Sequence, residues 1–109
     1  MSDRDLVRHI LDEVRFMRSR AGGTTSDAFL DDEVLKRAFA RSLEIVGEAT
    51  KKLTPAFRES HPEVEWRLLA GTRDKLIHDY FGVDYSIVWD IVINELPELE
   101  AELSPLTGP

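Results

Sequence analysis

The chain has 109 residues, which suits one domain with a single core, and its 42% hydrophobic and 32% charged residues are typical of a globular protein. It has no cysteine, which excludes disulfides and thiolate metal sites. The formal net charge of −7 argues against a general nucleic-acid-binding protein, because such proteins are normally basic.

The N-terminal sequence MSDRDLVRHI lacks the apolar segment of a signal peptide. No apolar run approaches the ~18 residues that would span a membrane. We therefore expect a cytoplasmic protein without membrane contacts.

Apolar residues at helical spacing predict a first helix from Asp3 or Asp5 to Arg20. Asp31 and Asp32 can cap a second, long helix from about residue 32 to residue 53. Gly47 lies inside this helix, where it either permits close approach of another helix or is a tolerated defect.

Thr54 and Pro55 start a short helical segment, which the His61-Pro62 pair ends. A third main helix is expected from about Glu63 to residues 78–80. Asp84 can cap a fourth, which Pro97 should kink or end and which continues for a turn or two to Leu103.

No segment alternates with period two, so no sheet is expected. Four amphipathic helices with short connections predict an all-α, antiparallel up-and-down four-helix bundle. We assign residues 1–103 to this domain and residues 104–109 to a flexible C-terminal tail.

Ionisable groups concentrate between Gly71 and Asp84, where the sequence reads GTRDKLIHDYFGVD. Asp74 and His78 would share a helix face, so Asp74 could hold one ring nitrogen of His78. Arg73 and His78 would lie about 140° apart around a helix. They could converge if the helix ended near His78, if the arginine side chain swept round, or if a second subunit contributed. The alternative is a surface salt-bridge network of little energetic value.

Other kinds of site find less support. His9, His61 and His78 are scattered and none has a histidine four residues away, so no metal site is predicted. The large aromatic residues fall on helical core faces, which favours a core role over base stacking; they are Phe39, Phe57, Trp66 and Trp89. The carboxylates of Glu95–Glu102 are expected on a solvated face.

The pattern Arg73, four residues, His78, one residue, Tyr80 makes chemical sense for RNA cleavage. A histidine can move the proton of a 2′-hydroxyl nucleophile or of the leaving 5′-oxygen, and an arginine can stabilise charge on the phosphate. Such cleavage needs no metal.

The segment RDKLIHDY (residues 73–80) resembles the Arg-x4-His-x-Tyr signature of HepT-like toxins of the HEPN superfamily. The resemblance extends in order over SLEIVGEATKKL (42–53), HPEVEW (61–66), YFGVD (80–84) and IVWDIV with LPEL (87–99). Gly71-Thr72 departs from the family, which often has a bulkier apolar residue just before the arginine.

The resemblance implies a homodimeric helical bundle in which two Arg/His sets face one cleft. It implies the toxin of a type VII-like toxin–antitoxin system, a metal-independent endoribonuclease that needs no cofactor and cleaves mRNA or tRNA rather than DNA. The motif carries over as Arg73 and His78 for catalysis, Asp74 for support and Tyr80 for modification.

The implied partner is a minimal nucleotidyltransferase antitoxin of the MntA type, which transfers AMP from ATP to Tyr80. Two alternatives stay open. Tyr80 could instead pack its ring into the core and hydrogen-bond through its hydroxyl group. The chain could also be a non-catalytic binding or regulatory subunit of a nucleotidyltransferase, which the acidic charge mildly favours.

Overall fold

The computed structural model describes residues 1–79 and 82–107, without the side chains of Arg73 and Leu76–Asp79. The described chain is helical apart from one short pair of strands. The all-α prediction is therefore confirmed.

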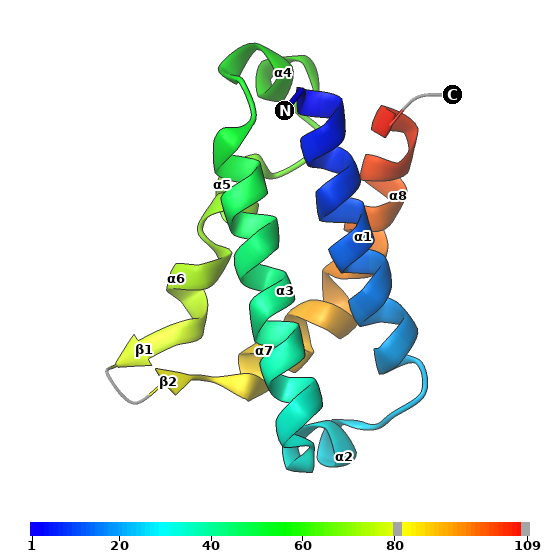
Figure 1. Ribbon diagram of the computed structural model, residues 1–109, viewed down its shortest axis with the longest axis vertical. Coiled ribbons are helices and arrows are strands. Elements are labelled where there is room, and N and C mark those ends of the chain that lie inside the picture. The colour runs from blue at the N-terminus through cyan, green and yellow to red at the C-terminus, as the bar shows by residue number, and fades with distance from the viewer. Residues whose placement is uncertain (80–81, 108–109) are drawn as a thin grey trace.

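The chain runs down, up, down and up along its long axis (Figure 1). The elements of these four passes are α1 (Asp3–Ala21), α3 (Glu33–Lys52), α5 (Trp66–Ala70) with α6 (Thr72–Leu76), and α7 (Tyr85–Asn94) with α8 (Leu96–Leu103). Helix α1 packs against α3 and α8, and α5 and α6 pack against α3. The third and fourth predicted helices are thus each divided in two.

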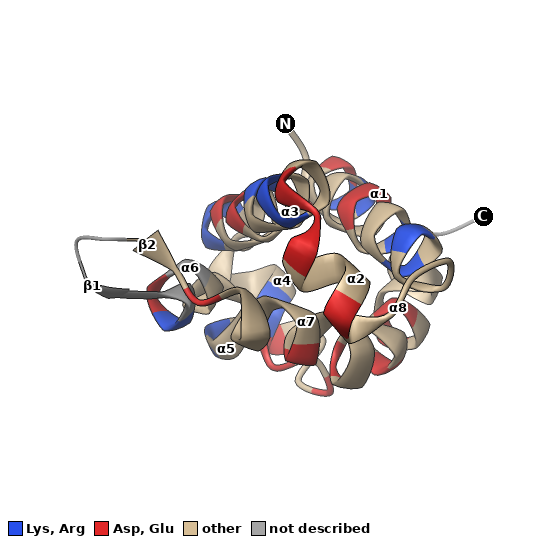
Figure 2. Ribbon diagram, turned by 90° about the horizontal axis from the view of Figure 1, so that it is seen from below, with Lys and Arg blue, Asp and Glu red and all other residues tan. Residues whose placement is uncertain are grey.

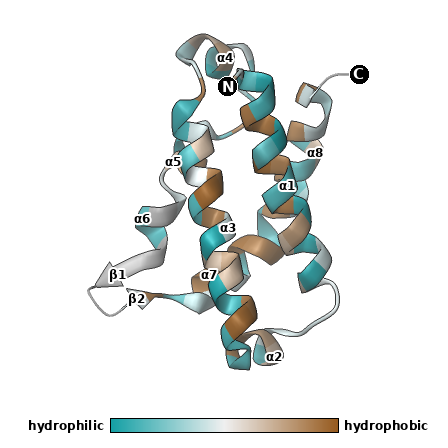
Figure 3. Ribbon diagram, viewed as in Figure 1, coloured by the Kyte–Doolittle hydropathy of each residue, from teal (hydrophilic) through white to brown (hydrophobic). Residues whose placement is uncertain are grey.

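Helix α1 begins at a capping box, in which the Ser2 hydroxyl accepts a hydrogen bond from the Asp5 amide at 3.1 Å and the Asp5 carboxylate accepts one from the Ser2 amide at 3.4 Å. Its predicted apolar stripe is buried, comprising Leu6, Val7, Ile10, Leu11, Val14 and Met17. Brown segments on the inward sides of α1 and α3 show this core in Figure 3.

Aromatic rings close the lower end of the core, where the short helix α2 (Ser26–Asp31) lies in Figure 1. The buried ring of Phe29 lies 5.1 Å, centroid to centroid, from the rings of both Phe39 on α3 and Trp89 on α7. Trp66 is buried, and Phe57 on α4 (Pro55–Ser60) packs against the core. The prediction that the large aromatic residues serve the core is confirmed.

Gly47 is a buried residue of α3 that lies against α5. A Cβ atom built on Gly47 would lie 3.5 Å from the carbonyl oxygens of Leu69 and Ala70 on α5. The backbone of α5 therefore passes directly over this glycine. Of the two interpretations of Gly47, close approach of another helix is confirmed.

The predicted third helix begins later and ends earlier than expected. It starts at Trp66, is interrupted at Gly71, and stops at Leu76. Strand β1 (Ile77–Asp79) then pairs antiparallel with β2 (Gly82–Val83), with Ile77 opposite Val83. Gly82 has a φ of +133°, which is readily accessible to glycine alone. These strands are too short for their alternation to show in the sequence, which is why no pairing was predicted.

The last pass starts and divides where the sequence predicts. The Asp84 carboxylate caps α7 by accepting hydrogen bonds from the amides of Ser86 (3.0 Å) and Ile87 (3.3 Å). Pro97 lies in the first turn of α8, where its missing N–H is tolerated. None of the helices in the described ranges is both long and apolar enough to cross a membrane.

Helix α8 is tied to α1 by charge. The Glu100 carboxylate contacts Arg18 at 2.8 Å and Arg15 at 3.5 Å. Beyond α8, the 3₁₀ helix η1 (Ser104–Thr107) contacts α1, and the Thr107 carbonyl accepts a hydrogen bond from Arg4. The domain boundary at residue 103 stays a prediction.

The Gly47 contact yields a stability prediction. Gly47→Ala should raise the free energy of unfolding by up to about 1 kcal/mol, because alanine favours the helix and its Cβ would meet α5 at an ordinary contact distance. Gly47→Leu should lower it by roughly 1–3 kcal/mol, because the longer side chain must displace the α5 backbone. Urea unfolding followed by tryptophan fluorescence measures both. Equal stability of the two variants would show that α5 does not rest on this position.

Candidate functional site

The segment that carries the predicted catalytic residues is anchored by Thr72. This side chain is only 5% exposed, and its hydroxyl lies 2.8 Å from the carbonyl oxygen of Leu69 and 3.2 Å from that of Leu68. These contacts link α6 to the last turn of α5 across the break at Gly71. Thr72 therefore holds the start of α6, and with it the backbone of Arg73, against the core.

Arg73 and His78 lie in consecutive elements. The backbone of Arg73 belongs to the first turn of α6, and that of His78 belongs to β1, which follows α6 directly. The side chains of both residues, and Tyr80 entirely, lie outside what the structure describes. Their catalytic and modification roles stay predictions.

The helical geometry assumed for Asp74 and His78 is wrong. The two residues were expected four apart on one helix face, but α6 ends at Leu76 and residues 77–79 are extended. Helix spacing therefore does not bring these two residues together. The Asp74 side chain is exposed, and its supporting role stays a prediction that needs a different geometry.

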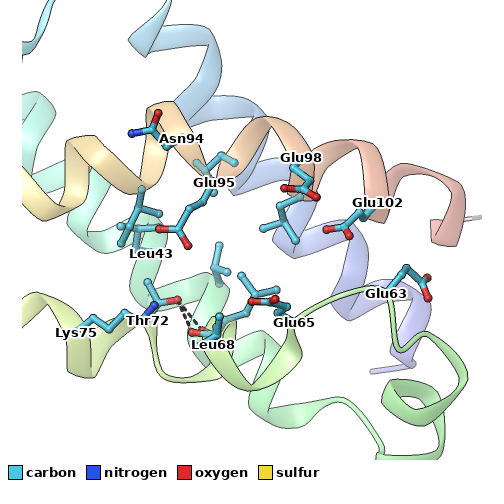
Figure 4. Close-up of a pocket in the computed structure, with 15 residues that line it drawn as sticks. Leu43, Glu63, Glu65, Leu68, Thr72, Lys75, Asn94, Glu95, Glu98 and Glu102 are labelled. Atoms are coloured by element: carbon cyan, nitrogen blue, oxygen red, sulfur yellow. Dashed lines mark hydrogen bonds between the residues drawn. The ribbon is translucent and has the colours of Figure 1, made fainter.

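The structure adds an acidic groove next to this segment, which the sequence did not predict. It has a volume of about 190 Å³ and lies between α5 and α6 on one side and α7 and α8 on the other (Figure 4). Five glutamates and one lysine line it: Glu63, Glu65, Glu95, Glu98, Glu102 and Lys75. Figure 4 shows Glu95, Glu98 and Glu102 on one wall pointing toward Glu65 and Leu68 on the other.

The carboxylates of α8 therefore have more varied surroundings than a solvated face. Glu98 is exposed, but it faces the α5 wall of the groove. Glu102 is half-buried there, and burial raises its pKa, with further contributions from the charges of Glu98, Glu63 and Glu65. Glu100, on the side of α1, has a pKa below its usual value because Arg18 and then Arg15 hydrogen-bond to the charged form.

The spacing of Glu95, Glu98 and Glu102 was a usable signal, since residues three and four apart share one helix face. The spacing could not show which residues this face of α8 lies against, because Glu63 and Glu65 come from a different part of the chain. Among the side chains that the structure describes, which do not include those of His78 and Asp79, no group of three or more histidine or acidic residues could hold a metal ion.

The comparisons with known proteins agree on one family. The family described as "Ribonuclease HepT-like" matches residues 10–106. The chain is 50% identical over 103 residues to "Putative RNase TTE0752" of Caldanaerobacter subterraneus subsp. tengcongensis, covering 94% of this chain and 92% of the relative. It is 36% identical over 105 residues to "Probable ribonuclease HepT" of Thermococcus cleftensis, covering 96% of each chain.

A further relative is "Putative RNase MJ0127" of Methanocaldococcus jannaschii, 40% identical over 109 residues, with 96% of this chain and 90% of the relative covered. No solved structure is significantly similar to the chain.

The two faces of α8 should respond to pH with opposite sign. The lowered pKa of Glu100 means that the unfolded chain binds more protons there, so this contribution to stability is complete above the usual value of 4.5 and is lost as pH falls through the folded-state pKa. Glu100→Gln should lower the free energy of unfolding at pH 7 by about 0.5–1 kcal/mol, and the difference from wild type should shrink below pH 4.5.

Glu102→Gln is the matched control on the same helix. Its raised pKa means that the charged form is disfavoured in the folded state, so stability falls as pH rises from 4.5 through the folded-state pKa. Removing the charge should therefore increase stability at pH 7. Urea unfolding between pH 3 and 8 measures both variants, and the same sign for the two at pH 7 would contradict the assignment.

Proposed function

Because the chain belongs to the family of HepT-like ribonucleases, we propose that it is a metal-independent endoribonuclease that acts as the toxin of a toxin–antitoxin system. The observation that carries this proposal is the match of the family over residues 10–106, together with full-length relatives whose names designate RNases. Its proposed substrates, mRNA or tRNA, place its action in the cytoplasm.

The proposed chemistry uses Arg73 and His78. The 2′-oxygen of a ribose attacks the adjacent phosphorus, the bond from phosphorus to the 5′-oxygen breaks, and the products are a 2′,3′-cyclic phosphate and a 5′-hydroxyl end. His78 accepts the 2′-hydroxyl proton or donates a proton to the leaving oxygen. Arg73 stabilises the negative charge that develops on the phosphoryl oxygens.

We propose that the active form is a homodimer of four-helix bundles whose two Arg/His sets face one cleft. One histidine could then accept the proton while the other donates one, so that both steps have a positioned group. Asp74 would support this arrangement by orienting an imidazole, either across the junction of α6 and β1 or from the second subunit.

The nuclease proposal predicts a large loss of activity in two variants. Arg73→Ala and His78→Ala should each reduce cleavage of an RNA oligonucleotide by ~10²–10⁴-fold, because each removes a group that acts on the reacting phosphate. The wild-type rate should not change when EDTA is added. Gel analysis of the cleavage products and circular dichroism of each variant provide the measurement.

Arg67→Ala is the matched control, because Arg67 is an exposed arginine on the neighbouring helix α5. It should keep close to wild-type activity. Cleavage that survives in both the Arg73 and His78 variants would remove these residues from the mechanism. A wild-type protein that binds its nucleotidyltransferase partner but cleaves no RNA would instead support the second candidate, a non-catalytic regulatory subunit, which the net charge of −7 favours.

We further propose control by AMPylation of Tyr80. The phenolic oxygen would attack the α-phosphate of ATP in the active site of an MntA-type nucleotidyltransferase, losing its proton and releasing pyrophosphate. The attached AMP carries one negative charge two residues from His78. It could occupy the place of the substrate phosphate and pair with Arg73, so both bulk and charge oppose RNA binding.

The Tyr80 proposal is tested with the chain's two tyrosines, Tyr80 and Tyr85. Tyr80→Phe should keep ribonuclease activity and remain toxic when the partner is co-expressed, because only the acceptor oxygen is removed. Tyr85→Phe should still be modified and silenced. Intact mass spectrometry should find AMP on wild type and on the Tyr85 variant; silencing of Tyr80→Phe without any adduct would show control by binding alone.

A further inference from the structure

The acidic groove has two properties that suit it to bind a partner. The first is negative charge that is not paired within the chain. Among the described residues, Glu65, Glu95, Glu98 and Glu102 form no ion pair. Glu63 has only His61, at 3.6 Å, which is a charged partner only when protonated. Of the six glutamates outside the groove, four are paired with lysine or arginine, namely Glu33, Glu44, Glu48 and Glu100, whereas Glu13 and Glu59 form no ion pair with a described residue. The groove therefore concentrates negative charge that the chain itself does not neutralise.

The second property is an apolar floor. Leu68 on α5 is 45% exposed, which is high for a leucine on a helix packed against the core. It shares the groove with apolar residues of α3, α5, α7 and α8, namely Leu43, Val46, Leu69, Ile91, Leu96 and Leu99. Five of these six side chains are buried, all but Leu69, so the apolar surface that a partner could reach is centred on Leu68. Apolar surface inside a polar rim is a feature of protein-interaction sites.

We propose that the acidic groove is the docking site for an amphipathic helix of a protein partner, with apolar residues on one face and lysine or arginine beside them. The apolar face would cover Leu68 and the groove floor, and the cations would pair with the glutamates of both walls. This inference rests on the groove alone and does not depend on ribonuclease activity.

Charge excludes the main rival occupants. RNA would bring phosphates against five glutamates and a single lysine. A second copy bound through the same groove by a two-fold axis would place glutamates against glutamates. A second copy bound through a different, basic face would leave its own groove open, and that contact would continue into a ring or an open chain of subunits rather than a closed dimer.

The location of the groove gives the docked helix access to α6. Thr72 and Lys75 both line the groove, and they lie on either side of Arg73 and Asp74 in this short helix. An occupant of the groove would therefore contact the element that carries the predicted catalytic arginine.

The probe for the test is a synthetic leucine–lysine peptide designed as an amphipathic helix, titrated into the full-length protein by isothermal calorimetry. A leucine–glutamate peptide with the same pattern and spermidine, a polycation without an apolar face, are the comparison ligands. The leucine–lysine peptide should bind and shift the amide NMR signals of α5, α6 and α8, and higher salt should weaken its binding. Shifts confined to other elements would overturn the proposal.

Matched variants separate the groove from the general acidity of the chain. The double variant Glu98→Lys and Glu102→Lys should weaken peptide binding at least about tenfold. Asp27→Lys with Glu59→Lys, which changes net charge equally at exposed positions outside the groove, should leave binding within about twofold. Equal effects of the two double variants would overturn the proposal.

Leu68→Ala tests the apolar floor without reversing a charge. It should weaken the peptide about threefold or more and leave the weak binding of spermidine unchanged. Circular dichroism confirms that each variant is folded; because Leu68 is largely exposed, this variant keeps the test decisive if the charge reversals disturb the fold. If Leu68→Ala has no effect and spermidine competes fully with the peptide, the groove binds polycations in general and the helix-docking proposal fails.

Discussion

The passage of α5 over Gly47 is the contact on which the position of the candidate catalytic segment depends. A side chain longer than that of alanine at residue 47 would hold α5 further from α3. The carbonyl oxygens of Leu69 and Ala70 would already lie at contact distance from a Cβ atom there. Three residues after Leu69, the buried Thr72 hydroxyl ties the start of α6 to the carbonyl oxygens of Leu68 and Leu69 in α5. The backbone of Arg73 is thus positioned by a chain of contacts that begins at a glycine 26 residues earlier in the sequence.

Helix α8 shows how one element can serve two electrostatic purposes. On the side of α1, Glu100 is held by Arg15 and Arg18, which stabilise its charged form and fix the helix to the bundle. On the opposite side, Glu98 and Glu102 line the groove together with Glu63 and Glu65, and none of the four forms an ion pair with a described lysine or arginine. Figure 2 shows acidic but no basic residues on α7 and α8, whereas α1 and α3 carry residues of both signs. The two helices α7 and α8, which form one wall of the groove, therefore carry acidic residues that no lysine or arginine of the same helices can balance.

The sequence predicted the helices where local chemistry decides their ends. Asp32 and Asp84 cap α3 and α7 as expected, and Thr54 with Pro55 starts α4. The stop of the third helix at Leu76 was not predicted, because the segment after it has no strong strand signal and its pairing partner, Val83, belongs to a separate short strand. The acidic groove was not predicted either, because its walls come from residues that only the tertiary fold brings together. Family resemblance supplied the candidate residues Arg73, His78 and Tyr80, which helical spacing alone left ambiguous.

The short length of α6 connects the groove to the proposed catalytic chemistry. A helix of five residues has almost no stability of its own, because forming the first turn orders several residues for a single hydrogen bond. Its conformation must therefore come from its neighbours: Thr72 and α5 before it, the strand pair after it, and α3 beneath it. On the groove side of α6, Thr72 is buried and anchored, whereas Lys75 is exposed and forms no ion pair with a described residue. A ligand in the groove would add contacts to the short helix that carries the backbone of Arg73, and a small differential affinity for one arrangement of α6 would suffice to shift its population.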